Sequence, residues 1–121
     1  MSLPMQEYVE KLPSTFPRHL LLAGRWLGDT AHVYEVAWPY PLILEVLAAL
    51  EDEFYAILGG DVYREESGHF IFANDTWGLN ADPAWTWLDY VQRSHKVSRD
   101  YIERYHSRNG DGFWYVPVFS S

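Results

Sequence analysis

The sequence predicts an α+β fold, in which a mainly antiparallel sheet of about four strands carries a long C-terminal helix and shorter N-terminal helices. Residues 54–77 contain two alternating segments joined by a polar turn, a pattern typical of a β-hairpin. Residues 87–105 carry apolar side chains at helical spacing. Residues 113–119 are again apolar and strand-like, so the long helix is expected to connect two strands of one sheet.

The N-terminal part predicts short elements that prolines and glycines separate. Residues 5–12 place apolar side chains on one side of a short helix. Residues 18–28 are too short and too interrupted by glycine for an assignment. Residues 31–39 alternate and predict a strand, whereas residues 41–53 predict a helix with an acidic end.

The first strand of the hairpin contains a Gly-Gly-Asp triplet, which is unusual because glycine weakens a strand interior. Gly59 and Gly60 therefore predict a bulge, or a large aromatic side chain of the long helix packed on bare backbone. A regular pleat would place Asp61 and Tyr63 on the same face as Ile57. Asp61 has two open roles, since it could hold a kink through backbone hydrogen bonds or belong to a recognition surface.

The long helix is predicted to begin at Asp82 and Pro83, because an N-cap carboxylate followed by proline is a common helix start. His95 falls on its apolar stripe, and we interpret it as a packed residue rather than a catalytic one. A glycine-rich turn follows, and residues 113–119 form the last strand. Pro117 lacks a backbone N–H, which predicts that this strand lies at a sheet edge.

Composition narrows the class of function. A chain of 121 residues suits one domain. The net charge of -8 argues against nucleic acid as a partner and suits a basic protein surface. The absence of cysteine excludes disulfides, thiol catalysis and thiolate metal sites. The N-terminus does not resemble a signal peptide and no long apolar run is present, so we expect a cytoplasmic protein without membrane association.

No motif for catalysis or for cofactor binding is present. The five histidines lack metal-site spacing, the serines lack a nucleophile elbow, and no glycine-rich phosphate loop occurs. Gly-Gly-Asp opens the signature of diguanylate cyclases, but the residues that follow do not continue it. We therefore predict a protein that is not an enzyme and has no cofactor or metal. A hydrolase that uses Asp61, Asp75 and a histidine is the weakest alternative.

The six tryptophans offer a second hypothesis. Trp85 and Trp87 are two positions apart and cannot share one helix face, so one of them should be exposed. Exposed tryptophans anchor protein interfaces and also stack on sugars. Trp77, Trp85 and Trp114 could therefore serve a carbohydrate- or small-ligand-binding module instead of a protein interface.

Four segments together resemble one known family: "VYEVAWPYPLILEVLAALEDEFYAILGGDVYREESG", "NDTW", "WLDYVQRSHKVSRDYIERYH" and "FWYVPVF". Over residues 20–119 the chain resembles the bacterial polymorphic-toxin immunity proteins of the immunity protein 40 family. The resemblance implies an inhibitor, without catalysis or cofactor, that binds one cognate secreted toxin and occludes its active site or a functional surface. Residues 1–121 would then form one immunity-type domain, with residues 1–18 as an N-terminal extension and residues 64–67 as a variable tip.

We expect the toxin to contact an acidic and aromatic surface near the hairpin. The predicted partner-binding residues are Asp61, Tyr63, Glu65, Glu66, Asp75, Trp77 and Trp85. The predicted structural residues are Gly59, Gly60, Asp82 and Pro83. The carboxylates would pair with Arg or Lys of a basic toxin, such as a nuclease. The predicted edge strand at Pro117 leaves a monomer or a weak homodimer open.

Overall fold

The computed structural model describes residues 1–121. Its elements in chain order are α1 (Leu3–Lys11), α2 (Arg18–Ala23), β1 (Arg25–Trp26), β2 (Val36–Pro39), α3 (Leu42–Asp52), β3 (Ala56–Glu66), β4 (His69–Gly78), α4 (Trp87–Asn109) and β5 (Phe113–Ser120). The strands form one antiparallel sheet in the order β1-β2-β5-β3-β4. The predicted α+β class is confirmed, with five strands instead of about four. The sequence missed α2 and β1, and the strand predicted over residues 31–39 is limited to β2.

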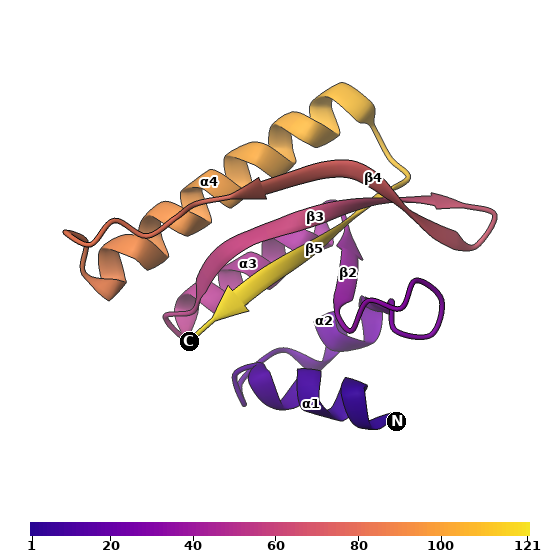
Figure 1. Cartoon of the computed structure of the whole chain (residues 1–121), viewed down its shortest axis with the longest axis horizontal. Helices are drawn as coiled ribbons and strands as arrows, with labels where there is room; N and C mark the ends of the chain where they lie inside the picture. Colours follow the sequence, from indigo (N-terminus) through magenta and orange to yellow (C-terminus); the bar gives the residue numbers. More distant parts are fainter.

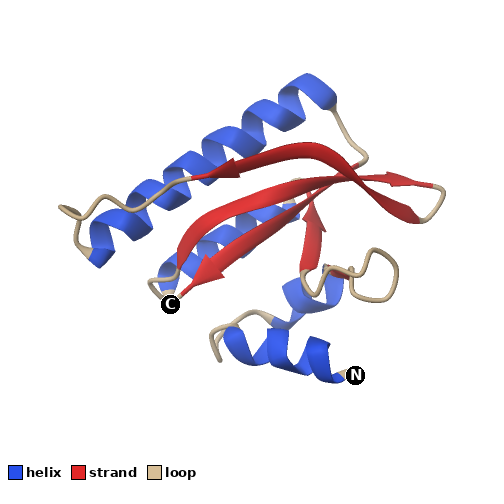
Figure 2. Cartoon of the chain, in the orientation of Figure 1, coloured by secondary structure: helices blue, strands red, loops and turns tan.

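Helices α3 and α4 pack on one face of the sheet, and this face lies behind the strands in Figure 1. Figure 2 shows the same view with helices in blue and strands in red. The main core fills the space between this face and the helices, and α1 contributes Tyr8 and Leu12 to it. Trp38 on β2 is fully buried and donates its Nε1–H to the carbonyl of Leu20 at 2.6 Å. Residues 1–18 thus pack through α1 against the rest of the chain.

The last strand is not at a sheet edge, so the prediction from Pro117 is wrong. β5 lies between β2 and β3. Its pairing with β2 joins Trp114 to Pro39 and Tyr115 to Trp38, and it does not continue to Pro117, which lies opposite Val36 in this register. The amide of Glu65 donates to the carbonyl of Gly112, and the alternation of an antiparallel ladder then turns the nitrogen of Pro117 away from β3. Pro117 therefore removes no hydrogen bond between β5 and β3, and the pairing of β5 with β2 ends before it, although its strand is internal.

The long helix α4 begins four residues later than predicted. Thr86 is its N-cap: the Thr86 hydroxyl accepts from the amide of Asp89, and the Asp89 carboxylate accepts from the amide of Thr86. This capping box satisfies the backbone N–H groups of both Thr86 and Asp89, whereas Asp82 accepts from one amide only. Asp82 instead accepts from the amide of Ala84 in a separate turn that contains Pro83. The assignment of Asp82 and Pro83 as the start of the helix is therefore wrong.

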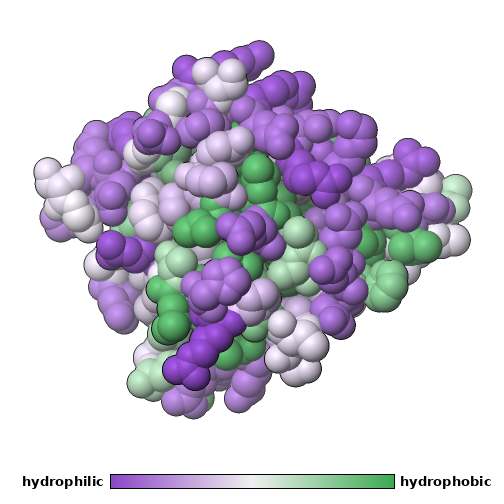
Figure 3. Space-filling model, turned by 180° about the vertical axis from the view of Figure 1, so that it is seen from behind, coloured by the Kyte–Doolittle hydropathy of each residue, from purple (hydrophilic) through white to green (hydrophobic).

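The apolar stripe of α4 is buried where it crosses the sheet and exposed at its beginning. Val91, His95 and Ile102 are buried as predicted, whereas Trp87 and Leu88 are 45% and 48% exposed. The other side of α4 carries charged residues, and the view from behind in Figure 3 shows a mainly hydrophilic surface around a central apolar band. The helix layer therefore presents a largely polar exterior.

Candidate functional site

Gly60 provides the space for a tryptophan side chain. A β-carbon at Gly60 would overlap the ring of Trp77 and would lie 2.6 Å from the carbonyl oxygen of Val116. The ring lies across this bare backbone and donates its Nε1–H to the hydroxyl of Ser98 on α4 at 2.9 Å. The prediction of an aromatic ring on the glycine backbone is confirmed, but the ring comes from the neighbouring strand β4 and not from the long helix.

A bulge before the glycines decides which way Asp61 points. The register of β3 against β5 shifts between Ile57 and Gly59, so that Leu58 is an extra residue. One extra residue moves every later side chain to the other face of the sheet. Ile57 therefore faces the helices while Asp61 and Tyr63 face away from them, in contrast to the regular pleat that the sequence predicted.

The sheet face turned away from α3 and α4 is called the open face below, and it is toward the viewer in Figure 1. It is formed by Arg25, Glu35, Ala37, Asp61, Tyr63, Glu65, Phe70, Phe72, Thr76, Trp114, Val116 and Val118. The guanidinium of Arg25 lies 5.8 Å from the centre of the Trp114 ring. Residues 27–35 cover its centre, where Leu27 packs on Tyr63 and Val116 and leaves Tyr63 only 7% exposed. Phe72 and Val118 remain 42% and 36% exposed. The open face is thus a partly covered apolar surface with carboxylates at its margin.

Two carboxylates on the open face lack a cationic partner. Asp61 and Glu35 form no ion pair within the chain. Burial raises the pKa of Asp61. Burial also raises the pKa of Glu35, and the charge of Asp61 raises it further while Lys11 opposes the shift. Burial raises the pKa of Tyr63, and the negative charges of Asp61 and Glu35 raise it further. A cation placed here would relieve this repulsion.

The kink-holding role considered for Asp61 is not found, because its carboxylate accepts no backbone hydrogen bond. Glu35 was not among the predicted site residues. It precedes β2 in an alternating segment, but only the order of the strands, which places β2 beside β5, reveals its proximity to Asp61.

The tip of the hairpin differs from the predicted turn. β3 continues to Glu66, and only Ser67 and Gly68 form the turn, with φ angles of 50° and 80°. Glu66 pairs with Arg64 on the same strand, with 2.7 Å between Nε and Oε1. Glu65 points to the opposite face and has no such partner. The two glutamates are therefore not equivalent.

Asp75 and Trp77 lie on the helix side, away from Asp61. The hydroxyl of Tyr105 donates to Oδ2 of Asp75 at 2.7 Å. Asp75 lines a cleft of about 510 Å³ whose other residues are Tyr101, Arg104, Tyr105, Arg108 and Asn109. Trp85 precedes α4, and the guanidinium of Arg93 lies 4.7 Å from the centre of its ring. Asp61, Tyr63 and Glu65 thus share the open face, whereas Asp75, Trp77 and Trp85 do not belong to it.

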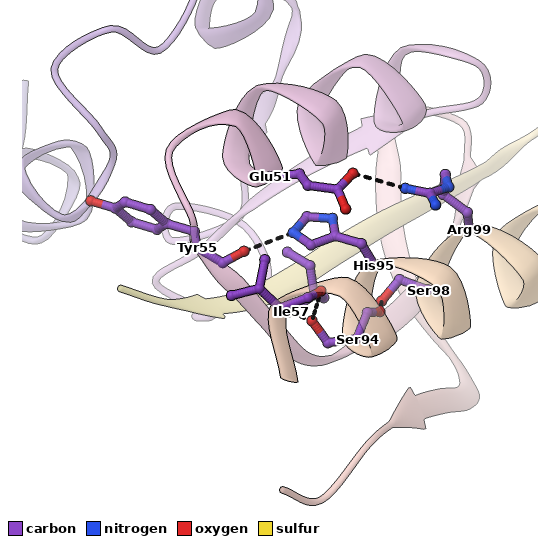
Figure 4. A network of polar contacts seen from close by, with 8 residues as sticks. Glu51, Tyr55, Ile57, Ser94, His95, Ser98 and Arg99 are labelled. Carbon is purple, nitrogen blue, oxygen red and sulfur yellow. Dashed lines mark hydrogen bonds and ion pairs between the residues drawn. The ribbon is translucent and has the colours of Figure 1, made fainter. Parts of the chain in front are cut away.

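A buried polar network joins α4 to β3 and α3, as Figure 4 shows. His95 is fully buried, and its Nε2 lies 2.7 Å from the carbonyl oxygen of Tyr55, which requires the hydrogen to be on Nε2. Burial lowers the pKa of His95 and keeps the ring neutral. The hydroxyl of Ser94 accepts from the amide of Ile57 at 3.0 Å. His95 therefore serves the packing of α4, as predicted.

The structure does not bring together the residues of the two alternative sites. A hydrolase would need Asp61 and Asp75 together, yet they lie on opposite faces of the sheet. The tryptophans proposed as sugar platforms are not brought together, since Trp77 faces α4 while Trp114 packs edge-on against Phe70 on the open face. No group of three or more potential ligands could hold a metal ion, and no helix is long and apolar enough to cross a membrane.

Comparison with known proteins gives one match. The family model described as immunity protein 40 matches residues 28–119, which confirms the resemblance seen in the sequence but begins later than the expected residue 20. No curated protein and no solved structure matches the chain.

Proposed function

Because the chain belongs to the immunity protein 40 family, we propose that it binds one cognate bacterial toxin domain through its open face and occludes the toxin's active site or another functional surface. Membership of this family implies toxin neutralisation and a cognate toxin partner, and its members are typically not enzymes. Beyond this family role, the proposal assigns the open face as the surface that binds the toxin. It takes residues 1–121 as a single domain that includes α1, acts in the cytoplasm and needs no cofactor.

One observation carries the choice of surface: unpaired carboxylates lie beside exposed apolar side chains on the open face. Glu65 and Asp61 have no cationic partner in the chain, and Phe72 and Val118 are more than a third exposed. Apolar anchors within a polar margin are typical of protein interfaces. On the helix side, Asp75, the carboxylate that the sequence predicted as a contact, is already bound by Tyr105.

The chemistry of the open face indicates a partner with a basic surface. The chain carries a net charge of -8, so long-range attraction would accelerate its association with a basic toxin. The charge of Asp61 raises the pKa of Glu35 although Lys11 opposes the shift, so both carboxylates would attract an approaching Lys or Arg. A nuclease presents such a surface to its own anionic substrate, so occupation by these carboxylates would block it.

The test begins with capture of the toxin. The tagged chain is used as bait in a lysate of the cells that produce it, and the captured proteins are identified by mass spectrometry. A captured domain is then expressed in a bacterial host with and without the chain. The proposal predicts that the domain is toxic alone, that the chain restores growth, and that the two copurify at a ratio near one to one.

Matched variants locate the interface. Asp61→Arg with Glu65→Arg reverses two charges on the open face and should abolish protection. Glu103→Arg with Asp100→Arg makes the same change in charge on the exposed side of α4 and should leave protection intact. Loss of protection in the second variant only, with both variants folded, would place the interface on the helix side and refute the proposed surface.

A further inference from the structure

The free edge of β4 forms a second feature of the hairpin, separate from the charges on the open face. β4 is the last strand of the sheet and has β3 as its only neighbour. Figure 1 shows the hairpin of β3 and β4 extending beyond the end of α4, so its tip has no helix beside it. Residues His69–Phe72 therefore form a projecting edge, here called the free edge.

The ladder geometry identifies the backbone groups that point outward from the free edge. Ser67 and Gly68 form a two-residue turn with positive φ, so the pair Glu66 and His69 closes the hairpin with mutual hydrogen bonds. Bonded and non-bonded pairs alternate in an antiparallel ladder. Phe70 and Phe72 therefore turn their N–H and C=O groups away from β3. Glu65 is the residue of β3 opposite Phe70, and its amide donates to the carbonyl of Gly112, on the side of β3 away from β4. This agrees with a non-bonded pair of Glu65 and Phe70.

The free edge lacks the usual protection against pairing with another strand. Natural sheet edges carry lysine, proline or a bulge that prevents such pairing. His-Phe-Ile-Phe contains neither lysine nor proline, and the bulge of β4 comes after it, where Asn74 has a φ of 60°. Ile71 and Phe72 are 39% and 42% exposed and point to opposite faces. An added strand would bury both side chains at once.

We infer that the free edge binds an extended segment of the toxin, which adds a sixth strand to the sheet next to β4. This inference rests on the proposed function and deepens it by naming the form of the partner. Such strand addition derives affinity from backbone hydrogen bonds and specificity from alternate side chains. The added strand should carry an apolar residue beside Phe72 and a basic residue beside Phe70, within reach of Glu65.

Charge favours a toxin strand over a second copy of the same chain. Two copies that pair along their free edges would each bring a net charge of -8 and an unpaired Glu65 to the contact. Two chains of the same net charge repel each other, whereas a basic strand is attracted to the same acidic residues.

Phe72→Pro tests the backbone contact directly. Proline removes the outward N–H of Phe72 without breaking a bond to β3, because proline is tolerated on edge strands where the N–H faces solvent. Phe72→Ala removes the same aromatic ring but keeps the N–H and is the matched control. With the toxin domain captured by the wild-type chain as the probe, Phe72→Pro should bind at least about tenfold more weakly than Phe72→Ala.

Equal binding by the two variants, with both folded, overturns the inference while the wild-type capture leaves the proposed function standing. Failure of the wild-type chain to capture any toxic domain refutes both. Should Phe72→Pro fail to fold, hydrogen exchange in the wild-type chain decides. The amides of Phe70 and Phe72 should exchange freely in the chain alone and at least about tenfold more slowly in the complex. Exchange that is unchanged in the complex overturns the inference. Exchange that is slow in the chain alone, and that slows further as the chain concentration rises, also overturns it and indicates pairing with a second copy.

Discussion

Trp77 lies against the bare backbone of Gly60, one strand away, and this contact fixes the position of two layers of the molecule. The ring occupies the place that a β-carbon of Gly60 would take, and its Nε1–H reaches Ser98 on α4. The same tryptophan thereby spans β4, β3 and the long helix. Gly60 is required for this packing, whereas Asp61 beside it is turned to the open face.

Gly60→Ala is expected to destabilise the fold, and Gly60→Val more strongly. The new β-carbon would overlap the ring of Trp77 and approach the backbone of Val116, neither of which can move without disturbing the sheet. Overpacking of this kind costs about 1–3 kcal/mol, or more where backbone is involved. Urea unfolding, followed by tryptophan fluorescence, measures the free energy of unfolding.

Gly78→Ala is the matched control. Gly78 is also a strand glycine, but its added β-carbon would lie 3.4 Å from the carbonyl oxygen of Leu58, an ordinary contact distance. Its unfolding free energy should remain within about 1 kcal/mol of wild type. A Gly60→Val protein as stable as wild type would contradict this account of the glycine pair.

The sequence was informative where local pattern decides the structure. The hairpin, α1, α3 and the buried residues Val91, His95 and Ile102 follow from periodicity, and the glycine pair correctly predicted close packing of an aromatic ring. The start of α4 was misplaced because two capping signals compete. Asp82 before proline is a good helix start, but the reciprocal hydrogen bonds of Thr86 and Asp89 satisfy one donor more.

The candidate site was less predictable because it depends on long-range pairing. The bulge at Leu58 reverses the faces of the residues after it, and only the alignment of β3 with β5 reveals this bulge. Asp61 and Glu65 consequently share a face with Glu35, while Asp75 and Trp77 are directed toward α4. Strand order likewise could not be read from Pro117, since its nitrogen points away from β3 and the pairing of β5 with β2 ends before it.

Asp61→Asn should stabilise the isolated chain at neutral pH and weaken toxin binding. Because the folded-state pKa of Asp61 is raised, its contribution to stability is fully present below the ordinary value of 3.8 and is lost as pH rises through the folded-state pKa. Asparagine removes this loss, so the urea midpoint of the variant should exceed that of wild type at pH 7, and the difference should decrease toward pH 4. Loss of a charged contact should weaken toxin binding by about tenfold. A variant that is no more stable than wild type at pH 7 would contradict the raised pKa.

Charge reversal should separate the two glutamates of the hairpin tip. Glu65→Lys removes an unpaired carboxylate from the open face and should slow association with the toxin by about tenfold at low salt, with a smaller effect at high salt. Glu66→Lys acts on the opposite face, where Arg64 already neutralises the carboxylate, and should slow association less. Stopped-flow measurements at two salt concentrations give the association rates. Equal association rates of the two variants would show that Glu65 is not a special contact. An association rate of the double variant equal to that of wild type would show that the tip does not contact the toxin.

His95 should make the stability of the chain fall in mild acid. Its folded-state pKa is lowered from 6.5 by burial, so the unfolded chain binds a proton at a higher pH than the folded chain does. The contribution of His95 is therefore fully present above pH 6.5 and is lost as pH falls below that value, with a limiting slope of about 1.4 kcal/mol per pH unit. The raised pKa values of Asp61 and Glu35 act in the opposite direction at lower pH. Urea unfolding at pH 7.5 and 5.5 should show a steep loss in wild type and a smaller one in His95→Gln, whose amide can still donate to the carbonyl of Tyr55. The same substitution at the exposed His69 is the control, and an equal loss in wild type and His95→Gln would show that another group governs the acid sensitivity.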